Sequence, residues 1–169
     1  MQRSGKTNME EILLGIGEIG VSVDGRPIRT QGLGCCVAVS LWCPAKRVAG
    51  LVQIVLPEAR INPGKGKEKP GYFADTGIPA LTAEMQDQGC AVLNSETQVK
   101  IVGGAQVMNS NDAFNIGAHN ISAVKSILRD RGFRIVAEEV GGHESKTVAV
   151  FPRTGDVMLT SPGQGEWYI

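Results

Sequence analysis

The chain has 169 residues, and 42% of them are hydrophobic, which is enough apolar material for one domain with its own core. Lysine plus arginine number 17 and aspartate plus glutamate 17, so no net charge draws the protein to nucleic acid or to an anionic membrane. No segment has the apolar length needed to span a bilayer, and no signal-peptide pattern is present. We expect a flexible tail over residues 1–10, a single domain over residues 11–169, and a cytoplasmic location.

The first half of the chain predicts strands separated by turns. Apolar residues at 12–14 and 21–23, on either side of a glycine-containing break, predict two short strands. Two longer apolar runs, 37–42 and 48–56, flank a short loop with a proline and two charges and predict an antiparallel hairpin. Residues 62–71 are mostly glycine, proline and lysine, and they predict a polar loop that moves in solution.

Two helices are predicted in the second half. The first begins at Asp75, a good N-cap, and ends at Gly89, with Pro79 in its first turn, where a helix tolerates proline. The second begins near Asn115 and stops at Gly132, with apolar residues at helical spacing between them.

The remaining strands are short and follow one another closely. A strand over 99–102 precedes the second helix, and three more are predicted over 134–140, 147–151 and 156–160, with glycine-containing turns between them. Because strands outnumber helices and adjoin through short turns, we expect an α+β fold with layered mixed or antiparallel sheets and two covering helices.

The segment most suggestive of chemistry is Gly-Leu-Gly-Cys-Cys over residues 32–36, just before the strand at 37–42. Glycines let a ligand approach the main chain closely, and a thiol at the point where a loop becomes a strand can face that ligand. Alternation along a strand predicts that Cys35 and Cys36 lie on opposite faces, so that at most one of them faces a site. Core packing is the alternative for both, since free cysteines are commonly buried.

A nucleophilic cysteine needs a base, usually a histidine close in space. The chain has two histidines: His119 lies in the first turn of the second predicted helix, and His143 follows two glycines in a turn. For each, an exposed or capping role is the alternative. Cys43 and Cys90 are expected to be incidental small residues, and the four cysteines lack the paired spacing of a zinc site, so we expect no metal and no cofactor.

Six segments, in this order, resemble those of a known family. They are Thr30-x-Gly-Leu-Gly-x-Cys36-Val-Ala-Val39, Val55-Leu-Pro57, Tyr72-Phe-Ala-Asp-Thr76, Val102-Gly-Gly-Ala105, Asn115-Ile-Gly-Ala-His-Asn120 and Ala137-Glu-x-x-Gly-Gly142. The chain is similar in these segments to the CheD family of chemoreceptor glutamine deamidases, and the resemblance extends over roughly residues 11 to 160.

The resemblance implies a layered α/β fold shared with some bacterial toxin deamidases, and a cysteine–histidine–threonine site that hydrolyses glutamine side chains. Carried over by position, the nucleophile is Cys36 and the threonine that orients the base is Thr30, whereas the family's histidine falls on Gln53. The main-chain N–H groups around Gly34 and Cys35 are candidates to stabilise the oxyanion.

Two hypotheses follow, because a glutamine at 53 can orient a substrate but cannot exchange a proton. The first is a deamidase of chemoreceptor glutamines whose base is water, or His143 or His119 brought near in the fold. The second is a CheD-like binding module with weakened turnover. The resemblance implies two partners, the cytoplasmic helical bundle of chemoreceptors and a CheC-type phosphatase. We expect no nucleic acid and no membrane insertion.

Overall fold

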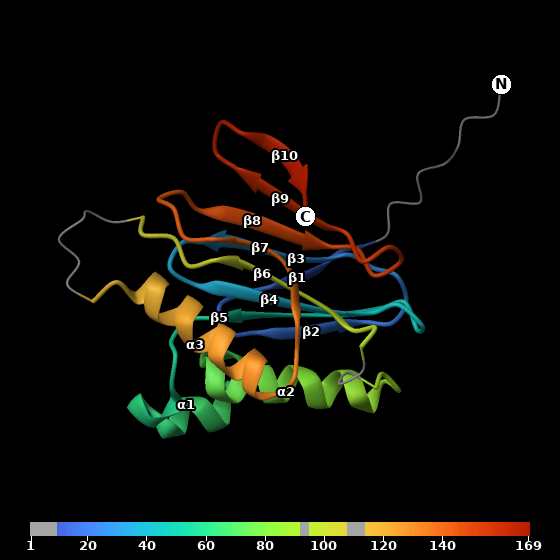
Figure 1. Cartoon of the computed structure of the whole chain (residues 1–169), viewed down its shortest axis with the longest axis horizontal. Helices are drawn as coiled ribbons and strands as arrows, with labels where there is room; N and C mark the ends of the chain where they lie inside the picture. Colours follow the sequence, from blue (N-terminus) through green and yellow to red (C-terminus); the bar gives the residue numbers. More distant parts are fainter. Residues whose placement is uncertain (1–9, 92–94, 108–113) are drawn as a thin grey trace.

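The computed structural model describes residues 10–91, 95–107 and 114–169 of the chain. It contains two five-stranded sheets packed face to face, and helices that cover the outer side of one of them (Figure 1). The helices are α1 (Pro63–Glu68), α2 (Ala74–Asp87) and α3 (Ile116–Asp130), with short 3-10 segments η1 (Ala59–Ile61) and η2 (Pro70–Tyr72). Among the described residues, no helix combines the length and apolar character needed to cross a membrane.

The first sheet has the strand order β1-β3-β8-β9-β10, and only its β1–β3 pair is parallel. Its strands are β1 (Ile12–Leu14), β3 (Ile28–Leu33), β8 (Lys146–Val150), β9 (Val157–Ser161) and β10 (Gly165–Tyr168). The second sheet has the order β2-β5-β4-β6-β7, and only its β6–β7 pair is parallel. Its strands are β2 (Ile19–Ser22), β4 (Val37–Cys43), β5 (Val48–Ile54), β6 (Gln98–Gly103) and β7 (Ile135–Val140).

Strands β4 and β5 are buried on both faces, which explains their continuous apolar sequences. One face of β4, with Val37 and Val39, packs against the helices, and the other, with Ala38, packs against the first sheet. Side-chain alternation along this central hairpin therefore determines whether a residue faces the helical core or the space between the sheets.

The predicted α+β fold with mixed sheets is confirmed, as is the hairpin of β4 and β5. The second predicted helix is confirmed as α3: the side chain of Asn115 accepts a hydrogen bond from the Ala118 N–H at 3.3 Å, and Gly132 follows the helix with φ of 80°. Strands β3 and β10 were not predicted. Residues 1–9 of the predicted tail lie outside the described residues.

The prediction of a moving loop over 62–71 is wrong, because α1 and η2 occupy most of this segment. Asn62 caps α1 by accepting from the Lys65 N–H at 3.1 Å, and Pro63 suits the first helical position. Gly66 is buried against Ala59, so closely that an added Cβ would lie 2.8 Å from the Ala59 Cβ. Local capping and close packing therefore order a segment that its polar composition alone does not.

Two details of the first predicted helix also differ. Asp75 is not the N-cap, because α2 begins at Ala74, and its carboxylate instead accepts from the Ala59 N–H at 2.9 Å. Pro79 lies in the interior of α2 rather than in its first turn. The glycines at 141–142 were predicted as a turn between paired strands, but β7 belongs to the second sheet and β8 to the first, so these residues cross between sheets.

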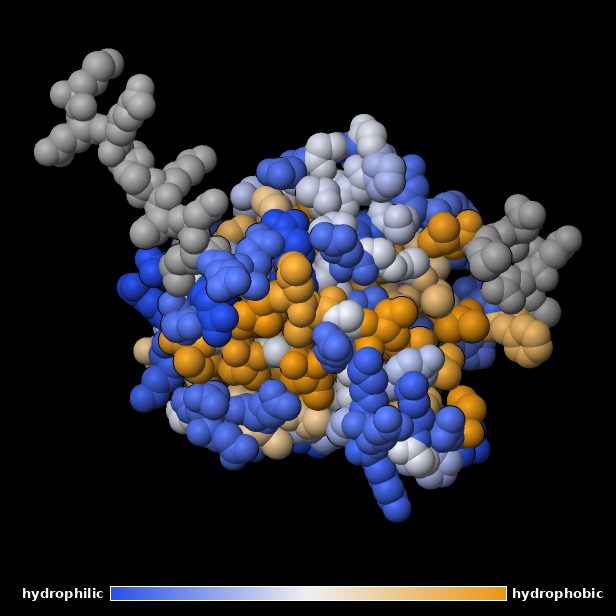
Figure 2. All heavy atoms as spheres, turned by 180° about the vertical axis from the view of Figure 1, so that it is seen from behind, coloured by the Kyte–Doolittle hydropathy of each residue, from blue (hydrophilic) through white to orange (hydrophobic). Residues whose placement is uncertain are grey.

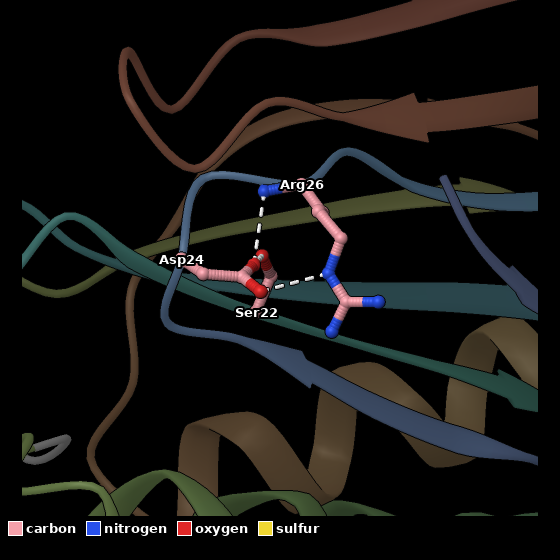
Figure 3. Close-up of polar contacts among 3 residues, drawn as sticks. All are labelled: Ser22, Asp24 and Arg26. Carbon is pink, nitrogen blue, oxygen red and sulfur yellow. Dashed lines mark hydrogen bonds and ion pairs between the residues drawn. The ribbon is translucent and has the colours of Figure 1, made fainter. Parts of the chain in front are cut away.

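The turn between β2 and β3 contains a polar cluster of Ser22, Asp24 and Arg26 (Figure 3). The Asp24 carboxylate accepts from the Arg26 main-chain N–H at 3.2 Å and from its Nε at 2.8 Å. This cluster precedes β3, whereas residues 34–36 follow it, so the strand separates the two by about 20 Å. The cluster closes a turn at the end of the sandwich opposite the thiol segment.

Candidate active site between the two sheets

Residues 34–36 connect the first sheet to the second, because β3 ends at Leu33 and β4 begins at Val37. The Cys36 side chain is 7% exposed and packs with the apolar residues between the sheets, whereas Cys35 is half-buried. The opposite-face placement of the two side chains stays a prediction, and Cys35 lies close enough to the Cys36 thiol to raise its pKa. Both residues precede the regular strand, where side-chain alternation does not yet apply.

Gln53 lies on β5 and its side chain enters the same space as that of Cys36. It pairs across the hairpin with Ala38, which packs between the sheets as Cys36 does, so the Gln53 side chain enters the same space as the thiol. Gln53 is 1% exposed, and its side chain forms a hydrogen bond with the Cys36 thiol.

Thr30 on β3 approaches from the opposite sheet and is also 1% exposed. Its hydroxyl donates to Gln53 Oε1 and lies 3.2 Å from a second acceptor, the Leu14 carbonyl oxygen. With Oε1 occupied by Thr30, the Nε2 of Gln53 is the group left to donate to sulfur. The structure thus brings together Cys36, Gln53 and Thr30, three residues that the sequence places on three different strands or strand ends.

The electrostatics of this buried cluster favour the neutral thiol. Burial is the largest effect and raises the pKa of Cys36, and the neighbouring Cys35 raises it further. The hydrogen bond from Gln53 acts in the opposite direction and lowers the pKa, but the net shift is upward. Cys36 is therefore a thiol rather than a thiolate near neutral pH, and a donor at residue 53 is the group that stabilises the ionised form.

Three consecutive carbonyl groups of the connection accept hydrogen bonds from other segments. The Gly34 oxygen accepts from the Ala105 N–H at 2.8 Å, the Cys35 oxygen from Asn120 Nδ2 at 3.0 Å, and the Cys36 oxygen from the Gly104 N–H at 2.8 Å. Within the described parts of the chain, no acceptor is recorded for the N–H of Cys35 or of Cys36. Of the predicted oxyanion donors, the Gly34 N–H already donates to the Gly32 carbonyl oxygen at 2.9 Å, so the N–H groups of Cys35 and Cys36 are the candidates that remain.

Among the described residues, neither candidate histidine is one of the groups that shift the pKa of the Cys36 thiol. His119 lies on the exposed side of α3, and His143 is exposed with its Nδ1 3.1 Å from the Gln106 carbonyl oxygen. The groups that act on the Cys36 thiol are Cys35 and Gln53.

Sequence reasoning missed Asn120 as a member of this site. It is fully buried on α3 and donates from Nδ2 to the carbonyl oxygens of Cys35 and Val55. A signal was present: Asn120 occurs at helical spacing with Gly117 and Val124 on the buried face of α3, where an amide is unexpected.

Comparison with known proteins gives a family for this arrangement. The sequence model described as CheD chemotactic sensory transduction matches residues 55–161. The chain belongs to the CheD family. A protein of Syntrophotalea carbinolica named probable chemoreceptor glutamine deamidase CheD is 48% identical over 162 residues, which cover 95% of this chain and all of that protein.

Two more distant CheD proteins also match over nearly their whole lengths. One from Thermotoga maritima, named chemoreceptor glutamine deamidase CheD, is 36% identical over 91% of this chain and 94% of its own length. A probable chemoreceptor glutamine deamidase CheD from Archaeoglobus fulgidus is 36% identical over 94% and 98%, respectively. The similarity to CheD proteins therefore extends well beyond the residues that the family model matches.

Proposed function

We propose that this CheD protein is a glutamine deamidase that acts on chemoreceptors, with Cys36 as the nucleophile. The observation that carries the proposal is the convergence of Cys36, Gln53 and Thr30 in one buried cluster between the sheets. The names of its relatives, chemoreceptor glutamine deamidases, supply the substrate class. The receptor's cytoplasmic helical bundle is the expected partner, which implies a cytoplasmic location, and a CheC-type phosphatase is the second expected partner.

In the proposed reaction the Cys36 thiolate attacks the carbon of a glutamine carboxamide and forms a C–S bond. The carbonyl oxygen becomes an oxyanion, for which the N–H groups of Cys35 and Cys36 are the candidate donors. When the oxyanion collapses, the C–N bond breaks and the nitrogen takes a proton to leave as ammonia. Water then attacks the thioester and the C–S bond breaks, which leaves a glutamate side chain and restores the thiol.

Gln53 occupies the position at which the family resemblance places a histidine. Its amide donates a hydrogen bond to sulfur but exchanges no proton, so the Cys36 proton leaves to solvent before the attack. Because the pKa of the Cys36 thiol is raised, the thiolate population, and with it the rate of acylation, keeps growing as the pH rises into the alkaline range. Thr30 holds the amide with Oε1 directed away from sulfur.

An apolar rim beside the connection suits a protein substrate. The Val107 side chain is 52% exposed and lies against Gly34, where an added Cβ would be 3.3 Å from Val107 Cγ2. Figure 2 shows further apolar side chains gathered on the face turned away from the viewer in Figure 1. The exposed Val107 side chain beside Gly34 supports binding of a helix through its apolar side chains.

The test is mass spectrometry of a receptor cytoplasmic fragment incubated with the protein at pH 7 and pH 9. We expect a mass increase of about 1 Da at particular glutamines, faster at pH 9, and absent with Cys36→Ala. Thr30→Val is expected to lower the rate, since it frees Gln53 to rotate. No conversion above the Cys36→Ala control at either pH would contradict the proposal; receptor binding in a pull-down would then favour the binding module.

A further inference from the structure

Asn120 is a buried amide whose hydrogen bonds hold the nucleophile's connection. Its Nδ2 lies 3.0 Å from the carbonyl oxygen of Cys35 and 2.8 Å from that of Val55, and the residue is 0% exposed. Both acceptors are carbonyl oxygens, so the amide orientation with nitrogen toward them is the one that avoids oxygen facing oxygen. Burying an amide costs free energy, and here its nitrogen bridges β5's end and the thiol segment.

The hydrogen bond to Cys35 determines where the next N–H points. The peptide bond between Cys35 and Cys36 is trans and planar, so its C=O and N–H point in opposite directions. Because Asn120 holds the Cys35 carbonyl toward α3, the Cys36 N–H is directed away from α3. The Ala105 N–H acts in the same way on the preceding peptide, through the Gly34 carbonyl.

We propose that Asn120 is a positioning residue that holds the Cys35–Cys36 peptide in the orientation in which the Cys36 N–H serves as an oxyanion donor. This inference rests on the proposed function, because it takes Cys36 as the nucleophile. Its second bond, to Val55, ties the donor peptide to the strand that carries Gln53 two residues earlier. The Asn120 amide thus fixes the position of the Cys36 N–H and sulfur relative to Gln53.

Close packing between the start of α3 and Gly104 keeps Asn120 next to residues 34–36. Gly117 lies one turn earlier on α3, so close to the Gly104 carbonyl that an added Cβ would be 2.4 Å from its oxygen. The Gly104 N–H donates to the Cys36 carbonyl oxygen at 2.8 Å. The start of α3 is therefore fixed next to the connection, which leaves the Asn120 side chain little freedom to move away from Cys35.

The consequence is specific to reactions that form an oxyanion. Attack of Cys36 on an ester or amide carbonyl places negative charge on oxygen, where a lost or misdirected donor costs on the order of 10²–10³ in rate. Alkylation of the same sulfur by iodoacetamide displaces iodide from a saturated carbon and forms no oxyanion. Without Asn120, acylation is expected to fall much more than alkylation.

The experiment compares these two reactions in the wild-type protein and in Asn120→Ala and Asn120→Asp. Acylation is measured as the burst of p-nitrophenolate from p-nitrophenyl acetate, after subtraction of the burst from Cys36→Ala. Alkylation is measured by mass spectrometry of the Cys36 peptide, both over pH 7–10. Ser122→Ala, an exposed change on the same helix, is the matched control. Asn120→Asp keeps the side-chain shape but replaces the donor by an acceptor.

We expect acylation to fall on the order of 10²-fold in both Asn120 variants, with alkylation within about 3-fold of wild type and no change for Ser122→Ala. Protection of the buried Cys43 and Cys90 from alkylation reports the folded fraction of each variant, and rates are compared per folded molecule. Equal losses in both reactions, unchanged acylation, or the absence of a Cys36-dependent burst in the wild type would overturn the inference. A normal burst without receptor deamidation would refute the proposed function alone.

Discussion

Replacing Gln53 by histidine places a titratable group beside the Cys36 thiol. An imidazole at this position lies on the same face as the Cys36 thiol and within reach of the Thr30 hydroxyl, because Gln53 already contacts both. In the wild-type protein the pKa of the thiol is above its ordinary value of about 8.5, so at pH 7 no more than about 3% is thiolate. The thiolate fraction therefore limits the rate at neutral pH.

The size of the expected gain follows from two effects. A cysteine paired with a histidinium has a pKa near or below 7, which raises the thiolate fraction at pH 7 at least about 15-fold. Proton transfer by a positioned histidine to the leaving nitrogen contributes a further factor on the order of 10². We expect Gln53→His to raise kcat/KM for receptor deamidation at pH 7 by on the order of 10³-fold, with a smaller gain at pH 9.

The assay is the conversion of receptor glutamines followed by mass spectrometry between pH 6 and 10. Gln53→Met is the matched control, since it fills a similar volume without a donor, and it is expected to slow the reaction and to move the Cys36 alkylation profile to higher pH. A thermal melt establishes that each variant is folded. If Gln53→His leaves both the rate at pH 7 and the pH profile unchanged, residue 53 does not determine the ionisation of Cys36, and the reasoning is refuted.

Three further predictions concern packing, binding and pH. Gly104→Ala adds a side chain at φ of 68°, 2.4 Å from Ile121 Cγ1, and should lower the free energy of unfolding by about 2–4 kcal/mol in urea titrations; Gly89→Ala, with φ of 83° and open space, should cost clearly less. Val107→Asp should raise KM for the receptor fragment several-fold with kcat little changed; a selective loss of kcat would contradict a binding role. Burial raises the pKa of the Cys90 thiol to about 12, so above about pH 8.5 this thiol ionises in the unfolded chain before it does in the folded one. The free energy of unfolding should therefore fall as the pH rises, and the fall should be shallower in Cys90→Ala.

The sequence was informative where periodicity and turn chemistry act locally. The β4–β5 hairpin, the N-cap of α3 at Asn115 and its stop at Gly132 follow from residues within a few positions of one another. The same local rules misassigned residues 62–71, because the composition of α1 is polar and its order depends on contacts such as that of Gly66 with Ala59. Sheet membership was also beyond local rules, since β7 and β8 are separated by five residues yet lie in different sheets.

The candidate site shows the same division between local and long-range information. Cys36 was recognisable from the glycines before it, and Thr30 and Gln53 from the family resemblance, but pattern alone does not bring together side chains of β3 and β5. Asn120 was predictable only as an amide on an apolar face; that its partners are the carbonyl groups of Cys35 and Val55 follows from how α3 crosses the ends of β4 and β5.

Two properties of the site bear on catalysis: the ionisation of the Cys36 thiol and the orientation of the Cys35–Cys36 peptide. Burial and Cys35 raise the pKa of Cys36 and the Gln53 side chain lowers it, so a substitution at residue 53 is expected to change the ionisation of the thiol strongly. The orientation of residues 34–36 depends on hydrogen bonds to their three successive carbonyl oxygens. The donors are Asn120 on α3 and the main-chain N–H groups of Ala105 and Gly104. A site that had lost its chemistry would be free to lose this orientation as well. In this chain the Cys35–Cys36 peptide is held by a buried amide that costs free energy to desolvate, which agrees with the proposed role of the Cys36 N–H as an oxyanion donor.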